Sequence, residues 1–215
     1  MKVVTTGTRE ALRNLRRELA ANVVHVGGWL AAALGPRLGE LQLHLGCGRR
    51  RLEGWVNVDL RRGADVRIDL REPLPFATGS AARVFAEHFL EHLDYPGHAT
   101  VFLRECYRVL RPGGRLRLGV PDTGMVLDAY ARGGDDEYFR LAKERWHPGW
   151  VVTPLEHVNF HFRDRLNEHR WAYDEASLHN LLHTIGFGDA HRSAFCTETD
   201  SDDRRLGTLY VEAVR

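Results

Sequence analysis

The sequence is poor in the residues that mark several classes of protein. It has only three cysteines, Cys47, Cys106 and Cys196, which are too few and too scattered for a disulfide framework or a zinc cluster and which fit a reducing compartment. Thirty Lys and Arg against 29 Asp and Glu leave a net charge of +1, without the basic excess typical of nucleic-acid-binding proteins. No internal repeat, low-complexity tract or linker divides the chain. These absences favour one cytoplasmic protein that binds no nucleic acid.

A long apolar run is missing as well. The apolar stretch 23–34 is interrupted by a histidine and two glycines, and it is too short to span a membrane, so stable membrane insertion is not expected. Before it, Leu12, Leu15 and Leu19 recur at helical spacing. Residues 1–40 are therefore expected to form an amphipathic helix that leads into a second, buried helix. This segment would serve as a cap on the domain or as a homodimer contact.

The chain does have the composition of a globular domain, with 215 residues of which 43% are hydrophobic. From residue 41 the pattern changes from helical to alternating. The predicted strands are 41–45, 55–59, 65–69, 82–86, 115–120, 189–195 and 208–214, with helices between them at 102–110 and 174–186. This order predicts an α/β fold, a Rossmann-like, doubly wound, mainly parallel seven-stranded sheet with helices on both faces.

The residues just beyond the strands are the candidates for ligand binding, because ligands of such sheets lie outside the carboxyl ends of the strands. Gly46-Cys47-Gly48 lets backbone approach a ligand closely and can offer exposed N–H groups to a carboxylate or phosphate. Asp59 suits a ribose diol, and Asp69-Leu70 suits an adenine. Glu87-His88 and Pro121-Asp122 follow the next two strands. Each signal alone is equally typical of a turn or a helix cap, so their order along the chain carries the argument.

Seven short motifs stand in a fixed order along the chain. They are LHLGCG at 43–48, GWVNVD at 54–59, LPF at 74–76, LEH at 90–92, ECYRVLRPGG at 105–114, VPD at 120–122 and HRWAYD at 169–174, followed by IGF at 185–187. As a set they resemble class I S-adenosylmethionine-dependent methyltransferases, and most of all the branch associated with glycan and surface-polysaccharide biosynthesis. The resemblance implies a methyltransferase domain over 41–215 with a substrate-binding insertion at about 123–170. Arg50 stands where the family motif usually has a third glycine, and the eleven positions between Gly48 and Asp59 leave no room for a full first helix.

The resemblance also implies roles for single residues. S-adenosylmethionine would be the cofactor, with its methionine part at Gly46, Cys47 and Gly48, its ribose at Asp59, its adenine at Asp69 and Leu70, and its sulfonium beside Glu87 and His88. The implied reaction is the O-methylation of a hydroxyl in a small saccharide or glycoconjugate precursor. A natural-product methyltransferase acting on a small molecule, an RNA methyltransferase and a non-catalytic cofactor-binding partner subunit are the alternatives.

Twelve histidines are available for the chemistry that such a substrate needs. A sugar hydroxyl is a poor nucleophile at neutral pH, and an imidazole titrates in the range that suits a general base. The catalytic candidates are His147 and His157 first, then His169, with Asp122 as a carboxylate base or substrate anchor. The same part of the chain supplies four aromatic residues that suit a carbohydrate face or, alternatively, a lid packed on its own core: Trp146, Trp150, Phe160 and Tyr173.

A metal ion is the other way to activate a hydroxyl. Some O-methyltransferases in this superfamily hold a divalent ion with a Glu-x-x-Glu-His arrangement, to which the segment from His88 to His92 is similar. His88, Glu91 and His92 are therefore candidate metal ligands, and Mg²⁺ would draw further oxygen ligands from Asp122 or Glu156. The alternative is that Glu91 and His92 simply pack and cap.

Overall fold

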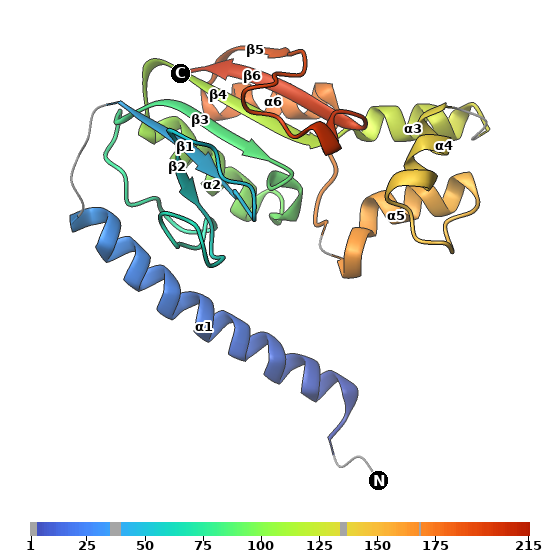
Figure 1. Cartoon of the computed structure of the whole chain (residues 1–215), viewed down its shortest axis with the longest axis horizontal. Helices are drawn as coiled ribbons and strands as arrows, with labels where there is room; N and C mark the ends of the chain where they lie inside the picture. The colour runs from blue at the N-terminus through green and yellow to red at the C-terminus, as the bar shows by residue number, and fades with distance from the viewer. Residues whose placement is uncertain (1–3, 35–39, 134–136, 168) are drawn as a thin grey trace.

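The computed structural model describes residues 4–34, 40–133, 137–167 and 169–215. A sheet with the strand order β2-β1-β3-β4-β6-β5 forms its centre (Figure 1). The strands are β1 (Leu41–Leu45), β2 (Val56–Val58), β3 (Ala81–Glu87), β4 (Leu110–Pro121), β5 (Gly188–Arg192) and β6 (Thr208–Val214). β1 to β4 pair in parallel, and β6 runs antiparallel to both β4 and β5. The predicted α/β class with a Rossmann-like sheet is confirmed.

The sheet has six strands rather than the predicted seven. The segment 65–69, expected to be a strand, forms only one isolated bridge, between Val58 and Val66. The carboxylate of Asp65 accepts hydrogen bonds from the backbone N–H of Asn57 (2.9 Å) and from its side-chain amide (3.0 Å). These bonds hold the start of the segment as a loop against β2, so strand pairing does not continue beyond the bridge.

The two faces of the sheet differ in chemistry. One face is apolar, with Leu43, Val84 and Leu118 in its centre, and α2 (Gly97–Val109) and α6 (Glu175–Ile185) pack on it. The opposite face carries polar side chains, of which Arg117 is bonded to the buried carboxylate of Asp200. Two loops, 49–55 and 193–206, cover this polar face through such contacts. The core of the domain therefore lies between the sheet and α2 and α6.

Both ends of α6 agree with the capping residues that the sequence analysis used to predict this helix. Asp174 and Ser177 form a capping box, in which the Asp174 carboxylate accepts from the Ser177 N–H (2.8 Å) and the Ser177 hydroxyl from the Asp174 N–H (3.1 Å). Gly186 ends the helix with a φ of 115°, a conformation that favours glycine. The predicted helix 174–186 is confirmed at both ends.

The segment 123–170, in which the sequence analysis placed no helix, forms helices in its described residues. They are α3 (Thr123–Ala131), α4 (Glu137–Arg145) and α5 (Pro154–Asn167), gathered beyond the end of β4 (Figure 1). The start of α5 is fixed by a second capping pair: the Glu156 carboxylate accepts from the Thr153 N–H (2.9 Å), and the Thr153 hydroxyl accepts from the Glu156 N–H (3.3 Å). Two short 3-10 helices, η1 (Leu90–His92) and η2 (Asp202–Arg204), complete the fold around this end of the sheet.

The N-terminal segment forms one continuous helix, α1 (Thr6–Leu34), rather than two. Its second half is not buried as predicted, because Val23 is 75% exposed and Leu30 is 51% exposed. The helix touches the domain with its polar and small residues: His25 Nδ1 accepts from the Asp69 N–H (3.1 Å), and Gly28 lies directly against the backbone of Arg67. Most of its described leucines and valines are exposed, and α1 extends outside the α/β domain as an arm (Figure 1). Of the described helices, none is long and apolar enough to cross a membrane.

Candidate active site

The backbone N–H groups of the loop after β1 form hydrogen bonds within the chain. The N–H groups of Gly46 and Cys47 donate to the carbonyl of Val58 (2.9 and 3.2 Å), and the N–H of Gly48 donates to Asp59 Oδ2 (2.8 Å). The expectation that these N–H groups are exposed for a ligand is therefore wrong. The two glycines are still required, since Gly46 has a φ of 71° and a Cβ there would lie 2.6 Å from the Phe89 ring.

Asp59 follows β2 and is half-buried beside this loop. Its two oxygens accept one bond each, from Gly48 and from the N–H of Arg61 (2.8 Å). A carboxylate offers about four lone-pair sites, so Asp59 has capacity left for the two hydroxyls of a ribose. The Cys47 side chain points the other way: it is buried, and burial raises the pKa of its thiol to about 11, which leaves only the backbone of Cys47 for ligand contact.

The predicted adenine side is engaged by the chain itself. Arg71 donates its backbone N–H and its guanidinium to the carboxylate of Asp69, and it reaches Glu18 of α1 at 2.7 Å. Burial opposes the ionisation of Asp69, but the Arg71 bonds outweigh it, so the pKa of Asp69 lies below its usual value. Leu70 is buried. The side chain of Asp69 as placed therefore has little capacity for an adenine, and its role in cofactor binding stays a prediction.

The end of β3 places two predicted residues in opposite surroundings. Glu87 is buried in the polar face of the sheet, where it accepts from the hydroxyl of Tyr210 (2.8 Å) and the N–H of Ser201 (3.0 Å). His88 has a φ of 51°, which turns its side chain to the other side, where its Nε2 meets Thr208 Oγ1 at 2.8 Å. Burial, together with the nearby charge of Arg204, holds the pKa of His88 well below its usual range. The His88 side chain thus faces the larger cavity of this region.

A cavity of about 780 Å³ opens beside His88, and a second cavity of about 250 Å³ adjoins it at Glu91, Pro121, His161 and His169. The larger cavity is lined by residues of η1, α4, α5 and η2, among them six histidines: His88, His92, His147, His157, His161 and His169. Neither cavity is lined by the predicted methionine, ribose or adenine residues, Gly46, Cys47, Gly48, Asp59, Asp69 and Leu70. The structure therefore brings the predicted catalytic histidines together but keeps them apart from the predicted nucleoside residues.

His147 and His157, the first-ranked catalytic candidates, face each other with ring centroids 4.4 Å apart. His157 is almost fully buried, and its ring also packs against Phe139 at 5.0 Å. Burial and the neighbouring His157 and Lys143 lower the pKa of His147 to about 4. At neutral pH the His147 ring is therefore uncharged and can accept a proton.

Asp122, the fourth catalytic candidate, faces away from the cavity. Its Oδ1 accepts from the Met125 N–H (3.1 Å) and caps α3, while its Oδ2 accepts from Arg192 (2.8 Å). Pro121 lines both cavities instead. These contacts give Asp122 a role in holding α3, and its role as a base stays a prediction.

The four aromatic residues of this region divide into two groups. Trp146 and Phe160 line the larger cavity beside the histidines. Trp150 is 59% exposed, and Tyr173 is buried in the core. The expectation of an aromatic face next to polar groups therefore holds for Trp146 and Phe160 in the larger cavity, whereas Tyr173 packs in the core and borders the smaller cavity.

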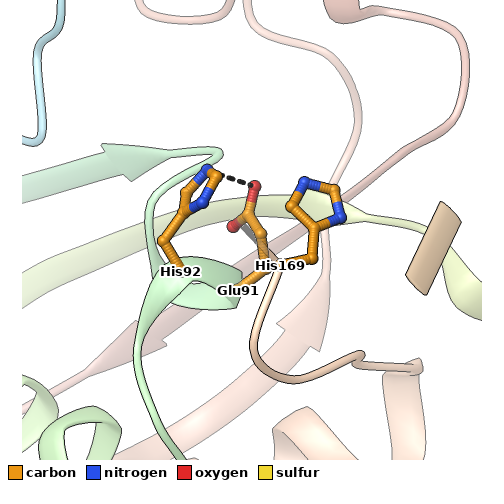
Figure 2. A group of neighbouring side chains, drawn as sticks. All are labelled: Glu91, His92 and His169. Carbon is orange, nitrogen blue, oxygen red and sulfur yellow. Dashed lines mark ion pairs between the residues drawn. The ribbon is translucent and has the colours of Figure 1, made fainter. Parts of the chain in front are cut away.

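Glu91 forms the centre of a second group of side chains (Figure 2). Its buried carboxylate lies 3.8 Å from His92 Nε2 and 3.6 Å from His88 Nδ1. One ligand atom each of Glu91, His92 and His169 lie within 4.8 Å of one another. Among the described residues, the group that could hold a metal thus contains His169 in place of the predicted His88. Glu156, the other predicted oxygen ligand, is used in capping α5, and Asp122 in capping α3.

Several cavity residues were missed by the sequence analysis. Tyr138 and Arg145 come from α4, and Arg204 comes from η2. None of them belongs to a motif, and η2 lies more than 100 residues beyond the strand end that it adjoins. Their position could be found only from the packing of α4 and of the loop 193–206 around the carboxyl ends of β3 and β4.

The strand order, the parallel strands β1 to β4 and the antiparallel β6 define a Rossmann-like sheet. Residues 51–118 match the family model described as a methyltransferase domain. This match covers β2, β3, α2 and most of β4.

Solved structures of similar fold carry the same description. An S-adenosylmethionine-dependent methyltransferase from Archaeoglobus fulgidus aligns with a TM-score of 0.50 at 15% identity, over 83% of this chain and 87% of that chain. Another, from Mesorhizobium loti, aligns with a TM-score of 0.49 at 21% identity, over 87% of this chain and 97% of that one. At this identity the Archaeoglobus likeness shows the fold. Together with the family match, it supports an S-adenosylmethionine-dependent methyltransferase.

A curated relative, an uncharacterized 37.1 kDa protein in transposon Tn4556 of Streptomyces fradiae, is 29% identical over 61% of this chain and 49% of its own length. The chain thus spans about half the length of the curated relative that it matches.

Proposed function

We propose that the protein uses S-adenosylmethionine to methylate a hydroxyl group of a small saccharide or glycoconjugate precursor. The observation that carries this proposal is the cavity of about 780 Å³ beyond β3 and β4, which is lined by six imidazoles, among them that of His88, the residue that the resemblance places beside the sulfonium. The family match and the fold support the transfer of a methyl group; the chemistry of the cavity supports the acceptor.

The residues present fit the cofactor best at its ribose and methionine parts. Gly46 and Gly48 allow a close approach of the backbone, and Asp59 has acceptor capacity left for the ribose hydroxyls. When bound, S-adenosylmethionine supplies an electrophilic methyl group on a sulfonium. His88 turns toward the cavity from the strand end that the resemblance places beside this sulfonium.

The chain contributes proton removal and alignment. His147, which is uncharged at neutral pH, or its neighbour His157 accepts the proton of the attacking hydroxyl, and the wall of α4 and α5 holds the acceptor in place. The acceptor class follows from the mixed lining, because Trp146 and Phe160 offer flat apolar faces while imidazoles, Asp202 and Arg204 offer hydrogen bonds. An apolar natural product would leave these polar groups without partners.

The test is a screen of unmethylated oligosaccharides and sugar nucleotides for release of the demethylated cofactor, with flavonoid-type phenols and short RNAs as the competing acceptor classes. Activity confined to saccharides supports the proposal. Turnover of phenols or RNA but not of saccharides would overturn the acceptor class, and binding of the cofactor without turnover of any acceptor would favour a non-catalytic subunit.

We further propose that α1 pairs with α1 of a second copy. Leu12, Leu15, Leu19, Val26 and Trp29 follow one another at intervals of three, four, seven and three residues, as in a coiled-coil seam, and each is at least 40% exposed. Light scattering of the full chain should give the mass of a dimer, and Leu15→Glu with Leu19→Glu should give a monomer. A monomeric parent protein would overturn this pairing. Binding of the full chain to anionic lipid vesicles, without a dimer in solution, would also overturn it.

A further inference from the structure

We infer that Glu91, His92 and His169 form a binding site for a divalent first-row transition-metal ion at the floor of the histidine-lined cavity. The ligand atoms of the three side chains already lie within 4.8 Å of one another, and His92 Nε2 lies 3.8 Å from Glu91 Oε1. With metal–ligand bonds of about 2.0–2.2 Å, ligand atoms around one ion lie roughly 3–3.5 Å apart. Small side-chain rotations therefore suffice to close the site.

The orientation of His169 supports a ligand role independently of these distances. Its Nδ1 lies 2.8 Å from the carbonyl oxygen of His161. A carbonyl only accepts, so Nδ1 carries the proton and Nε2 of the uncharged ring carries the lone pair. Figure 2 shows the other nitrogen of His169 turned to the side of Glu91, whose carboxylate lies between the two imidazoles. Metal-bound histidines are commonly fixed through such a bond to a backbone carbonyl.

The backbone holds the two halves of the site together. The N–H groups of Arg170 and Trp171 both donate to the carbonyl of Glu91, at 2.7 and 3.2 Å. Residues that lie about 80 positions apart in the sequence are thereby fixed side by side. His88 Nδ1 also lies 3.6 Å from the Glu91 carboxylate, and His88 Nε2 is held by Thr208, so His88 positions Glu91 rather than completing the set.

The donor set selects the metal. Two imidazoles and one carboxylate suit Mn²⁺, Fe²⁺, Co²⁺, Ni²⁺ or Zn²⁺, whereas Mg²⁺ prefers oxygen ligands and water. Three protein ligands leave coordination positions open, and both cavities border Glu91 and His169. If the proposed function holds, a substrate hydroxyl can occupy an open position, where the ion lowers its pKa. This last step alone rests on the proposed function; the metal site itself does not.

The experiment uses the full chain after dialysis against a chelator, titrated calorimetrically with Co²⁺, Zn²⁺ and Mg²⁺, with the visible spectrum of bound Co²⁺ as a second readout. One Co²⁺ or Zn²⁺ per chain is expected, with much weaker Mg²⁺ binding. His92→Ala and His169→Ala should each weaken Co²⁺ binding by about 10-fold or more and change the Co²⁺ spectrum. The control His191→Ala, an exposed histidine on β5, should change neither.

Glu91→Gln is the sharpest variant, but its side chain is buried, so circular dichroism must first show that the variant folds. If it does not fold, the partly exposed His92 carries the test. Absence of stoichiometric Co²⁺ and Zn²⁺ binding by the folded parent, or unchanged affinity in both histidine variants, would overturn the site. The affinity for S-adenosylmethionine is measured separately, in the metal-free protein. If the protein binds the cofactor but no metal, only the metal site is contradicted. If it binds metal but no cofactor, only the proposed function is contradicted.

Discussion

The two halves of the crevice at the carboxyl ends of the strands are built in different ways. In the nucleoside half, around Gly46, Asp59 and Asp69, backbone donors and carboxylates are bonded within the chain. In the histidine half, around His147, His157 and Glu91, polar groups are held by burial and ring packing beside an open cavity. The first half is thus a fixed frame with few spare acceptor sites, whereas the second half is the part that we propose to exchange protons and bind an ion.

The largest effect is expected in the histidine half. His147→Gln combined with His157→Gln should lower kcat by about 10²–10⁴-fold, the usual contribution of a general base, while calorimetric affinity for S-adenosylmethionine stays within about twofold of the parent. Because the pKa of His147 is about 4, the kcat of the parent should stay flat between pH 7 and 5 and fall only nearer pH 4. A profile that falls around pH 6.5 would assign the base to a less buried group, and full activity of the double variant would place it elsewhere.

The matching test of the nucleoside half is Asp59→Ala. Loss of hydrogen bonds to a charged group should weaken cofactor binding by about 1.5–3 kcal/mol, roughly 10- to 100-fold. Asp59→Asn keeps one acceptor oxygen and should lose less. Unchanged affinity in the alanine variant would remove Asp59 from the cofactor site and with it the assignment of this half.

The nucleoside half also contains an acid-sensitive group, His44. His44 on β1 is buried, its Nδ1 donates to Asn57 Oδ1 (3.1 Å), and burial lowers its pKa to about 4. Between about pH 6.5 and 4 the unfolded chain binds a proton at His44 that the folded chain does not, so stability falls as the pH falls. The expected loss is about 2 kcal/mol between pH 6.5 and 5.

His44→Asn, which keeps a donor at the place of Nδ1, should flatten this dependence in urea unfolding experiments at several pH values. An equally steep loss of stability in the variant would show that other groups cause it.

An effect of similar size is expected where α1 meets the nucleoside half. A Cβ at Gly28 would lie 1.9 Å from the carbonyl oxygen of Arg67, so Gly28→Ala should push α1 from the segment 67–69 at a cost of about 1–3 kcal/mol. Gly27→Ala is the matched control, because nothing lies within 4 Å of its Cβ position, and it should stabilise the helix by about 0.5–1 kcal/mol. Hydrogen exchange along 20–30 should rise in the first variant only. Equal exchange in both would show that this contact does not hold α1.

Local signals in the sequence predicted those parts of the fold that depend on local chemistry. The capping box at Asp174 and the left-handed Gly186 were readable, and so were the strands that end at Leu45 and Glu87. The start of α5 carried the same kind of signal, Thr153-x-x-Glu156, so the helices of 123–170 were in part predictable. Residues with a signal of this kind need only their own neighbours to form the structure.

The remainder of the site depends on partners far away in the sequence. That the N–H groups of Gly46 and Cys47 donate to Val58, and that Arg71 saturates Asp69, follows from how the chain folds back on itself. The meeting of Glu91 with His169 has the same origin, since it is set by the hydrogen bonds of the next two residues to the Glu91 carbonyl. Spacing within a motif could suggest His88 as a ligand, but it could not show that a residue about 80 positions away lies closer to the right geometry.

The path of the chain between Asp122 and Tyr173 has a consequence for how such proteins diversify. These two residues form a parallel bridge, and the Thr123 N–H donates to the Tyr173 carbonyl (3.2 Å). The stretch that supplies α3, α4 and α5 thus departs from the sheet and rejoins it at one point. Such a stretch can be replaced without changing the sheet. A different stretch, joined at the same two residues, would line the cavity with other side chains while leaving the strands and their loops as they are.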